Sequence, residues 1–385
     1  MAAGSLLFAS GLPLCYATAV LPHSALSHSP TPIMKTTAAE ILSAFAPQGL
    51  IKEMVGPDQP INRIVAVEDC APGDLVFVDK AEYVAVVTVR RPAVVVTSFK
   101  LKALLAGCGD LTLLLTPNVN LAQALIKQRY AGRQFDAAGW PRIHPSAVVH
   151  ETAVVPVTAV VEPGAVIGRN VRLGERTRIM AGAIIEHDAQ VGSDTVVHPN
   201  AVIGYGCVVG NEAAIGAGSV IGSEGYGFAQ DQQGKSHPIP QTGTVVLGDR
   251  VRVGANCCID RAAYRTTRVG AGTKLDNLCH IAHNVEIGED CLLTSMLCVA
   301  GSTTIGNRVM TSGQTGIKDH VKICDDVVLV HRAGVTADID QPGAYAGLPV
   351  QPLKEYMRNT AVLRMLADLR QRLLAVERRD EAPAA

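Results

Sequence analysis

The sequence predicts a mainly β protein built on a parallel β-helix, with a small α/β domain before it and a helical segment after it. Three observations lead to this prediction: a six-residue hydrophobic repeat through the middle of the chain, an aromatic content of only 4%, and different apolar patterns toward the two ends. The length of 385 residues also exceeds what one ordinary domain needs, so more than one structural unit is expected.

The hydrophobic period runs through residues 143–221, where all 14 positions in register hold Val, Ile or Leu. It returns at residues 247–259, slips by four residues, and continues through residues 269–335 with Thr311 as the one exception. Hexapeptide repeats are typical of parallel β-helices. Three hexads would close a coil of about 18 residues, and the coils would stack about 4.8 Å apart. A narrow interior of small aliphatic side chains agrees with the scarcity of aromatic residues.

Two segments interrupt the repeat, and a β-helix has no structural need for them. Residues 223–246 contain a glycine-rich run, and residues 262–267 hold the four-residue slip. Loops on a rigid scaffold commonly carry binding residues. We therefore expect a binding site beside these insertions, with tolerated surface insertions as the alternative.

The N-terminal part, residues 35–138, lacks the period and predicts a small α/β domain. Helices are expected at residues 37–45 and 121–129. Strands are expected at residues 62–67, 75–78, 84–89 and 93–97. Trp140-Pro141 marks the boundary to the β-helix at residues 141–340.

The two ends of the chain have distinct compositions. Residues 1–34 contain no Lys, Arg, Asp or Glu, whereas a secretory signal needs a basic start. We expect a disordered extension or an upstream start codon, with Met34 as the working start, and a targeting role for residues 1–34 as the alternative. The C-terminal segment, residues 345–385, has the apolar spacing of a helix over residues 353–379. The polar side of this predicted helix carries seven basic and three acidic residues.

Composition excludes several classes of function. The chain has 34 Lys and Arg against 35 Asp and Glu, a formal charge of −1, which argues against a nucleic-acid-binding protein. No stretch approaches the ~20 apolar residues of a spanning helix. Ten cysteines occur without any CxxC pair, which favours buried thiols in a reducing compartment, and hence the cytoplasm.

The strongest chemical signal lies in residues 275–285. His283 follows Ile281 within its hexad and so lies at a turn; Gly301 comes 18 residues later, one coil on, and His320 comes 37 residues later. An imidazole beside a backbone N–H suits acyl transfer to an amine, because the imidazole accepts the amine proton and the N–H binds the oxyanion. A solvated turn histidine is the alternative.

Several motifs together resemble the UDP-3-O-(3-hydroxyacyl)glucosamine N-acyltransferases of lipid A biosynthesis, a family of hexapeptide-repeat acyltransferases. These motifs are Asp276-Asn277, Ile281-Ala282-His283-Asn284, Gly225-Tyr226-Gly227-Phe228, Ile239-Pro240-Gln241 and Ile259-Asp260-Arg261. The similarity covers the chain from Lys35 to the final helix, in the domain order of the family. It implies a left-handed β-helix, whose hand the repeat alone does not determine.

The resemblance also implies roles for individual residues. His283 would be the general base on the 2-amino group of the sugar, oriented and polarised by Asp276. The Gly301 N–H would be the oxyanion donor. Asn284 and His320 would assist substrate binding or the leaving thiol.

In the N-terminal domain, the resemblance implies a uridine site in which Phe77 and Tyr83 stack on the uracil ring. Lys80-Ala81 stands where the family often has Asn-Pro, which departs from its pattern of polar uracil contacts. Gln241 is also expected to contact substrate. The implied partners are UDP-3-O-acylglucosamine, a 3-hydroxyacyl carrier protein as donor, and two further copies of the chain in a homotrimer with sites between subunits. No metal or cofactor is implied.

Two further features concern the donor. An acidic carrier protein suits the basic C-terminal helix, although a solvated helix capping the trimer is an equal alternative. Gly334 stands where some relatives carry a bulkier residue near the end of the acyl chain, so we expect a longer acyl groove here.

Three other functions remain open at this point. The first-step UDP-N-acetylglucosamine O-acyltransferase shares the repeat but lacks a uridine-binding domain before it. A γ-type carbonic anhydrase needs three histidines on zinc, and Ala282 between His280 and His283 offers no ligand. A non-catalytic β-helical scaffold would have uninterrupted repeats and no flanking domains.

Overall fold

A computed structural model of the chain describes residues 36–108, 110–132 and 139–380, with side chains described as far as residue 375. By its contacts the chain divides into two compact units, Met1–Ala137 and Ala138–Ala385. The expected extension at residues 1–34 lies outside the described residues. Within the described ranges, no helix combines the length and apolar character that crossing a membrane requires.

The first unit is an α/β domain around a five-stranded sheet in the order β2-β7-β6-β5-β4. The strands of this domain are β1 (Thr36–Thr37), β2 (Glu53–Val55), β3 (Pro60–Ile61), β4 (Arg63–Ile64), β5 (Asp74–Val78), β6 (Val94–Ser98) and β7 (Thr112–Thr116). Strands β1 and β3 pair with each other in a separate two-stranded sheet. The helices of the domain are α1 (Ala38–Phe45), α2 (Val84–Arg90), α3 (Lys102–Leu105) and α4 (Val119–Tyr130), with short 3-10 turns at η2 (Val67–Asp69), η3 (Ala81–Tyr83) and η4 (Phe99–Leu101). The expected helices at residues 37–45 and 121–129 are confirmed. Thr37 and Glu40 form a reciprocal capping box at the start of α1.

The strand expected at residues 84–89 is wrong, because these residues form helix α2. Their β-branched composition favours a strand, but β5 and β6 pair in parallel, and parallel neighbours need a crossover connection. Helix α2 provides that crossover. It buries only Val87 and leaves Val89 80% exposed, so tertiary topology overrides local propensity here.

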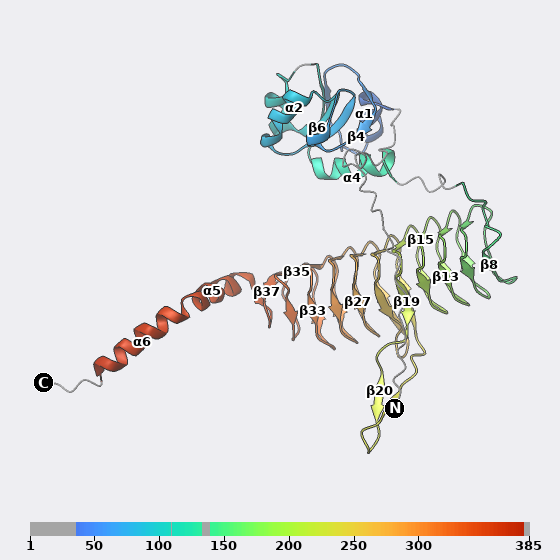
Figure 1. Ribbon diagram of the computed structural model, residues 1–385, viewed down its shortest axis with the longest axis vertical. Coiled ribbons are helices and arrows are strands. Elements are labelled where there is room, and N and C mark those ends of the chain that lie inside the picture. Colours follow the sequence, from blue (N-terminus) through green and yellow to red (C-terminus); the bar gives the residue numbers. More distant parts are fainter. Residues whose placement is uncertain (1–35, 109, 133–138, 381–385) are drawn as a thin grey trace, which may run out of the picture. The chain divides into compact units, whose positions relative to one another are not determined.

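The second unit confirms the predicted parallel β-helix, with three parallel sheets around an aliphatic core (Figure 1). The β27 sheet contains β8 (Val148–Val149), β10 (Val166–Ile167), β13 (Ile184–Ile185), β16 (Val202–Ile203), β19 (Val220–Ser223), β24 (Cys258–Asp260), β27 (His280–Ile281), β30 (Cys298–Val299), β33 (Gly316–Ile317) and β36 (Gly334–Val335). The β28 sheet contains β11 (Arg172–Leu173), β14 (Gln190–Val191), β17 (Val208–Val209), β22 (Thr244–Leu247), β25 (Thr266–Val269), β28 (Glu286–Ile287), β31 (Thr304–Ile305) and β34 (Lys322–Ile323). The β26 sheet contains β9 (Val160–Val161), β12 (Arg178–Ile179), β15 (Val196–Val197), β18 (Ala214–Ile215), β23 (Arg252–Val253), β26 (Lys274–Leu275), β29 (Leu292–Leu293), β32 (Met310–Thr311), β35 (Val327–Val330), β37 (Gly343–Ala346) and β38 (Gln351–Pro352).

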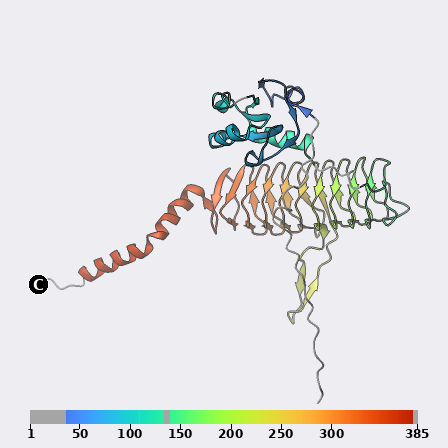
Figure 2. The ribbon, with the colours of Figure 1, turned by 45° about the horizontal axis from the view of Figure 1, so that its top comes forward.

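Each coil visits the three sheets in turn, so residues one coil apart pair side by side (Figure 2). Ile281 pairs with Val299, and Val299 with Ile317. These side chains point inward and are at most 4% exposed. The predicted hexad register is therefore the register of the core.

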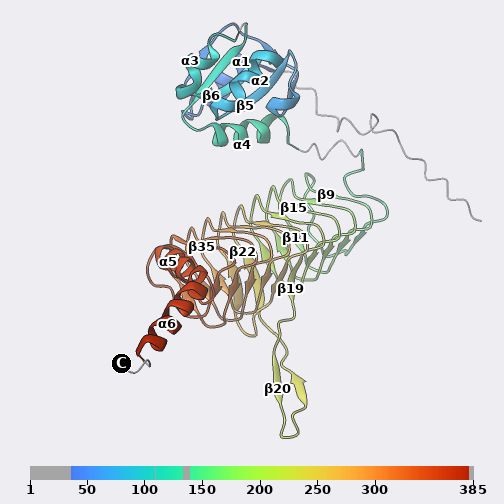
Figure 3. The ribbon, with the colours of Figure 1, turned by 60° about the vertical axis from the view of Figure 1, so that its left-hand side comes forward.

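The first insertion leaves the β-helix between β19 and β22 as a hairpin (Figures 1 and 3). Its antiparallel strands are β20 (Phe228–Gln230) and β21 (Ser236–Pro238). The buried guanidinium of Arg261 joins both ends of this insertion, because it donates to Gly222 O at 2.9 Å and to Gly243 O at 3.2 Å. It also lies 3.4 Å from the ring centroid of Tyr205, so the base of the hairpin is firmly held.

The C-terminal segment forms two helices, α5 (Leu353–Arg364) and α6 (Leu366–Asp380), where one was expected over residues 353–379. The break falls at Met365, whose N–H donates to Val362 O at 2.9 Å. This bond spans three residues and tightens the last turn of α5. Helix α5 contacts β37 and β38.

Candidate active site

His283 lies at the corner where the chain passes from the β27 sheet to the β28 sheet. Both insertions leave from this same corner: the hairpin connects β19 to β22, and residues 262–265 connect β24 to β25. The sequence places these segments apart, but successive coils stack them beneath His283. The expected site beside the insertions is thus where the fold gathers them.

The imidazole of His283 lies directly against the backbone of Gly301 in the next coil. A Cβ atom added at Gly301 would lie 2.7 Å from Cε1 and 2.8 Å from Nε2 of His283. Any side chain at this position would displace the ring. On its other side, His283 faces Gly225 of the hairpin base, where an added Cβ would lie 3.0 Å from the His283 Cβ. Two glycines therefore make room for one imidazole.

The Gly301 amide has no hydrogen-bond acceptor among the described residues. At this hexad position some amides are capped by a side-chain oxygen from the next coil, whereas others, such as that of Gly313, also have no acceptor among the described residues. Asn307 Oδ1 caps the Glu289 N–H, and Asp325 Oδ1 caps the Asn307 N–H, each at 2.8 Å. The Gly301 N–H is left available to a ligand beside the imidazole.

Asn284 determines which nitrogen of His283 carries the proton. Its Oδ1 accepts the Ala263 N–H at 3.0 Å, and its Nδ2 donates to Tyr264 O at 2.9 Å, so the orientation of the amide is set by two backbone groups. The same Oδ1 lies 3.2 Å from His283 Nδ1. Because this oxygen can only accept, Nδ1 must donate, and Nε2 is left as the basic nitrogen.

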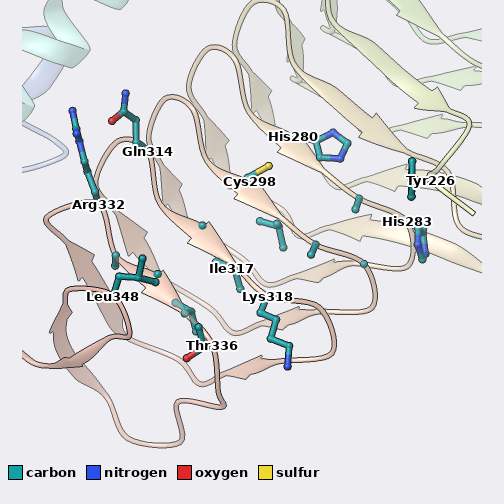
Figure 4. A pocket seen from close by; sticks show the side chains of 18 residues that line it. Tyr226, His280, His283, Cys298, Gln314, Ile317, Lys318, Arg332, Thr336 and Leu348 are labelled. Atoms are coloured by element: carbon teal, nitrogen blue, oxygen red, sulfur yellow. The ribbon is translucent and has the colours of Figure 1, made fainter.

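A groove of about 680 Å³ extends from His283 across the β27 sheet (Figure 4). Its floor is largely small or aliphatic, and its rims carry Gln314, Lys318 and Arg332. His283 and Tyr226 lie at one end in Figure 4 and Leu348 at the other. The lining residues of the floor include Ala282, Val299, Ala300, Gly316, Ile317, Gly334 and Val335.

The longer groove expected from Gly334 is not formed. A Cβ at Gly334 would lie only 2.1 Å from Leu348 Cδ1, so the leucine already fills the space that the glycine leaves. The segment carrying it is hydrogen-bonded onto Gly334, through Gly334 N–H to Gly347 O at 2.8 Å and Val350 N–H to Gly334 O at 3.0 Å. Leu348 therefore stands at this end of the groove.

Asp276 does not meet His283 within one chain. It follows β26 and so lies at the corner between the β26 and β27 sheets, one corner before His283. There it lines a second groove, of about 670 Å³, with Lys274 and Asn277. Its carboxylate accepts the Asn277 N–H at 2.8 Å.

His320 lies at the predicted site, whereas Gln241 does not face the groove. His320 lies at the same corner as His283, with its N–H donating to Gly301 O at 3.1 Å, and its side chain is exposed. Gln241 is only 2% exposed, inside the hairpin base, where Nε2 donates to Ile239 O and Oε1 has no partner among the described residues. Gln241 therefore packs behind the site rather than facing the groove, contrary to the expected substrate contact.

Phe77 and Tyr83 do not form a pair of facing rings. Phe77, in β5, packs with the cluster that includes Leu75 and Leu114, whereas Tyr83 packs with the cluster that includes Val76 and Val78. Successive residues of a strand face opposite sides of a sheet, so these clusters lie on its two faces. Both aromatic side chains are partly exposed near the carboxyl end of β5.

Sequence reasoning assigned no role to Asp260 and His280, which the fold brings together next to the groove. His280 Nε2 lies 3.7 Å from Asp260 Oδ2, and Ser223 Oγ donates to Asp260 Oδ1 at 2.7 Å. Burial raises the pKa of the Asp260 carboxyl, against the opposing effects of Ser223, His280 and His283. The sequence contains a signal for this proximity. One 18-residue coil plus the four-residue slip after Ile259 places His280 beside Cys258 in the next strand of the sheet. Within the described ranges, no three His, Cys, Asp or Glu side chains lie close enough together to hold a metal ion.

Comparison with known proteins identifies relatives of this chain. The profile of the GMPPB C-terminal domain family matches residues 143–226. A UDP-3-O-acylglucosamine N-acyltransferase of Methylococcus capsulatus is 49% identical over 345 residues, which is 90% of this chain and 98% of that protein. The enzyme of the same name from Bordetella avium is 44% identical over 41% of this chain and 45% of its own length.

Solved structures show weaker similarity. The structure of Arabidopsis UDP-N-acetylglucosamine acyltransferase covers 56% of this chain and 76% of its own, with 22% identity and a TM-score of 0.46. The Methylococcus relative, by contrast, covers nine-tenths of this chain. The scaffold and zinc-enzyme alternatives are set aside, and the chain belongs to the UDP-3-O-acylglucosamine N-acyltransferase family of acyltransferases.

Proposed function

We propose that this chain transfers a 3-hydroxyacyl group from acyl carrier protein to the 2-amino group of UDP-3-O-acylglucosamine, a step of lipid A biosynthesis. One observation carries the proposal: the basic nitrogen of His283 and the uncapped N–H of Gly301 lie together at the head of an apolar groove. Thioester aminolysis needs a base, an oxyanion donor and a site for an alkyl chain, and this corner offers all three.

In the proposed reaction the sugar amine attacks the thioester carbonyl. As the N–C bond forms, His283 Nε2 accepts the amine proton, and the carbonyl oxygen becomes an oxyanion near the Gly301 N–H. The C–S bond then breaks, and the protonated imidazole returns its proton to the leaving thiolate. Asn284 supports this role because it holds the proton of the neutral ring on Nδ1.

The substrates would approach from different parts of the chain. The acyl chain would lie along the groove toward Leu348. The acidic carrier protein would meet the exposed cations of α5 and α6, among them Arg358, Arg364 and Arg370, through attraction that weakens with salt. Phe77 and Tyr83 remain the proposed contacts of the uracil ring.

A homotrimer would complete the site. Asp276 lies at a different corner from His283 in one chain, so it could polarise an imidazole only in another copy. The groove at Asp276 runs along the β26 sheet and the groove at His283 along the β27 sheet, and the two share the coils of residues 274–283 and 292–301, which supports a site shared between subunits. The absence of Asp276 from the surroundings of His283 is thus a reason to propose assembly.

Replacing Asn284 by Asp is expected to move the acidic limb of the pH–rate profile to higher pH. A carboxylate keeps the acceptor for the Ala263 N–H and for His283 Nδ1, but it adds a negative charge that stabilises the protonated imidazolium. The base is then inactive over a wider acidic range. Initial rates from pH 5 to 9 would check this; an unchanged profile with a normal melting temperature would contradict the role of Asn284.

Replacing Leu348 by Ala is expected to shift the donor preference toward longer acyl chains, because it opens the end of the groove over Gly334. One methylene in an apolar pocket changes kcat/KM by about 10-fold or more. Donors that differ by two carbons, offered in pairs, would measure the shift by product mass. Leu104→Ala, at an exposed leucine of the first unit outside this groove, is the control. An unaltered length profile in Leu348→Ala would disprove the role of Leu348 in limiting the length of the acyl chain.

The proposed function is tested directly with purified protein, UDP-3-O-acylglucosamine and a series of 3-hydroxyacyl carrier proteins. The expected product has gained one acyl group on nitrogen, which mass spectrometry and resistance to mild alkali distinguish from an ester. UDP-N-acetylglucosamine serves as the competing acceptor. Transfer to its hydroxyl group, with none to the amine, would reject the proposal in favour of an O-acyltransferase.

A further inference from the structure

His280 and Asp260 form an imidazole–carboxylate pair beside the groove. Their strands, β27 and β24, are neighbours in the same sheet, and His280 Nε2 lies 3.7 Å from Asp260 Oδ2. The Asp260 side chain is 7% exposed, whereas that of His280 is 44% exposed and lines the groove together with His283. The pair thus has one buried end and one end open to the acyl site.

The β-helix itself does not require an imidazole–carboxylate pair at this place. Along the same columns of the β27 sheet the outward residues are small, such as Cys298 above His280 and Ala300 above Ala282. A buried carboxylate is costly unless it is paired and hydrogen-bonded. Asp260 has Ser223 and His280 as direct partners, while His283 and Cys258 are the other titratable groups near it. Ser223 thus holds the Asp260 carboxylate, which in turn faces the ring of His280.

The position of His280 matches the first carbon atoms of a bound acyl chain. His280 and Ala282 point outward from the same strand, and His283 follows at the corner. At about 3.3 Å per residue, the Cα atoms of the two histidines lie at most about 10 Å apart. Beyond them the floor is formed by Ala300, Ile317 and Val335, which suit an alkyl chain. A polar ring at the head and an apolar floor beyond it fit a chain that is polar only near its reactive end.

We propose that His280, held in place by Asp260, hydrogen-bonds a hydroxyl group of the acyl chain close to the thioester carbonyl and so selects hydroxyacyl over plain acyl donors. This inference rests on the proposed function and adds a specificity residue to it. His280 contacts the donor, and Asp260 is a positioning residue that acts through His280. A hydroxyl group of the acyl chain at this point would replace its hydrogen bond to water by one to the imidazole, whereas a plain chain offers the imidazole no such partner.

The test compares 3-hydroxyacyl and plain acyl carrier proteins of equal chain length as donors. The wild-type protein is expected to prefer the hydroxylated donor by about 10- to 100-fold in kcat/KM. His280→Leu should bring this ratio close to one, His280→Gln should restore part of it, and Asp260→Asn should lower it to an intermediate value. His187→Leu is the matched control, since His187 also pairs with a carboxylate, Asp188, but follows strand β13, far from β27 in the sheet.

The outcomes separate this inference from the proposed function. If the wild-type protein transfers no acyl group, the proposed function fails. If it transfers acyl groups but His280→Leu keeps the wild-type donor ratio, the inference is wrong. A rise in KM for the sugar acceptor alone, with the donor ratio kept, would assign His280 to the acceptor and also overturn the inference. Melting curves of each variant exclude unfolding as the cause of a changed rate.

Discussion

Replacing His283 by Ala is expected to lower kcat by about 10²–10⁴-fold, the usual contribution of a positioned general base. The substitution removes the only group that is proposed to accept the amine proton. It should leave the fold intact, because the His283 carbonyl still accepts the Ser302 N–H at 3.0 Å and the core residues Ile281 and Val285 are unchanged. Initial rates measured by product mass, together with a melting curve, would check both parts.

His187→Ala is the control for this experiment. His187 occupies the same hexad position as His283, two residues after the inward aliphatic residue and at the same corner, but in a coil far from the groove. Its turnover should match the wild type. Wild-type turnover in His283→Ala would remove His283 from the mechanism and with it the main argument of the proposed function.

Replacing Gly301 by Ala is expected to lower kcat by about 10²-fold or more while changing stability little. The new Cβ would lie 2.7 Å from Cε1 of His283, so the imidazole must swing away from the amide. The atom that gives way is the free end of a side chain, and the coil itself need not move. A misplacement of about 1 Å in a reacting group can cost about 10²-fold in rate. Steady-state kinetics and melting curves would separate the two effects.

Gly313→Ala is the matched control. Gly313 is the second residue after the inward Thr311, just as Gly301 is the second residue after the inward Val299. There an added Cβ meets nothing closer than Ser295 O at 3.5 Å, which is an ordinary contact. Activity should be retained. If Gly301→Ala were as active as Gly313→Ala, the contact between the imidazole and the Gly301 backbone would be irrelevant to catalysis.

The core and the His283–Gly301 contact could be predicted because both follow from one period. When every sixth residue points inward and three hexads close a coil, the neighbours of any residue lie one coil away along the chain. Ile281 and Val299 pair in this way, and the residues two positions later, His283 and Gly301, meet at the corner. Local sequence determines long-range contact only in such a repetitive fold.

The same period separates Asp276 from His283 within one chain. Asp276 directly follows the inward Leu275, whereas His283 is the second residue after Ile281, so the two lie at successive corners of one coil. The expectation came from a motif shared with relatives, and a motif carries no information about which subunit supplies each residue. The strand predicted at residues 84–89 is wrong for a separate reason. This β-branched run forms a helix, because the parallel strands on either side of it need a crossover connection.

The sequence alone determined the β-helix, the set of inward residues and the position of an imidazole beside a glycine in the next coil. The tertiary structure alone decided the protonated nitrogen of His283, the closure of the groove by Leu348 and the pairing of His280 with Asp260. The first group depends on a regular backbone with one conformation per hexad. The features decided by the tertiary structure depend on the irregular segments at residues 223–246, 262–267 and 347–350. These segments follow no sequence period, and their path is set by packing against the β-helix.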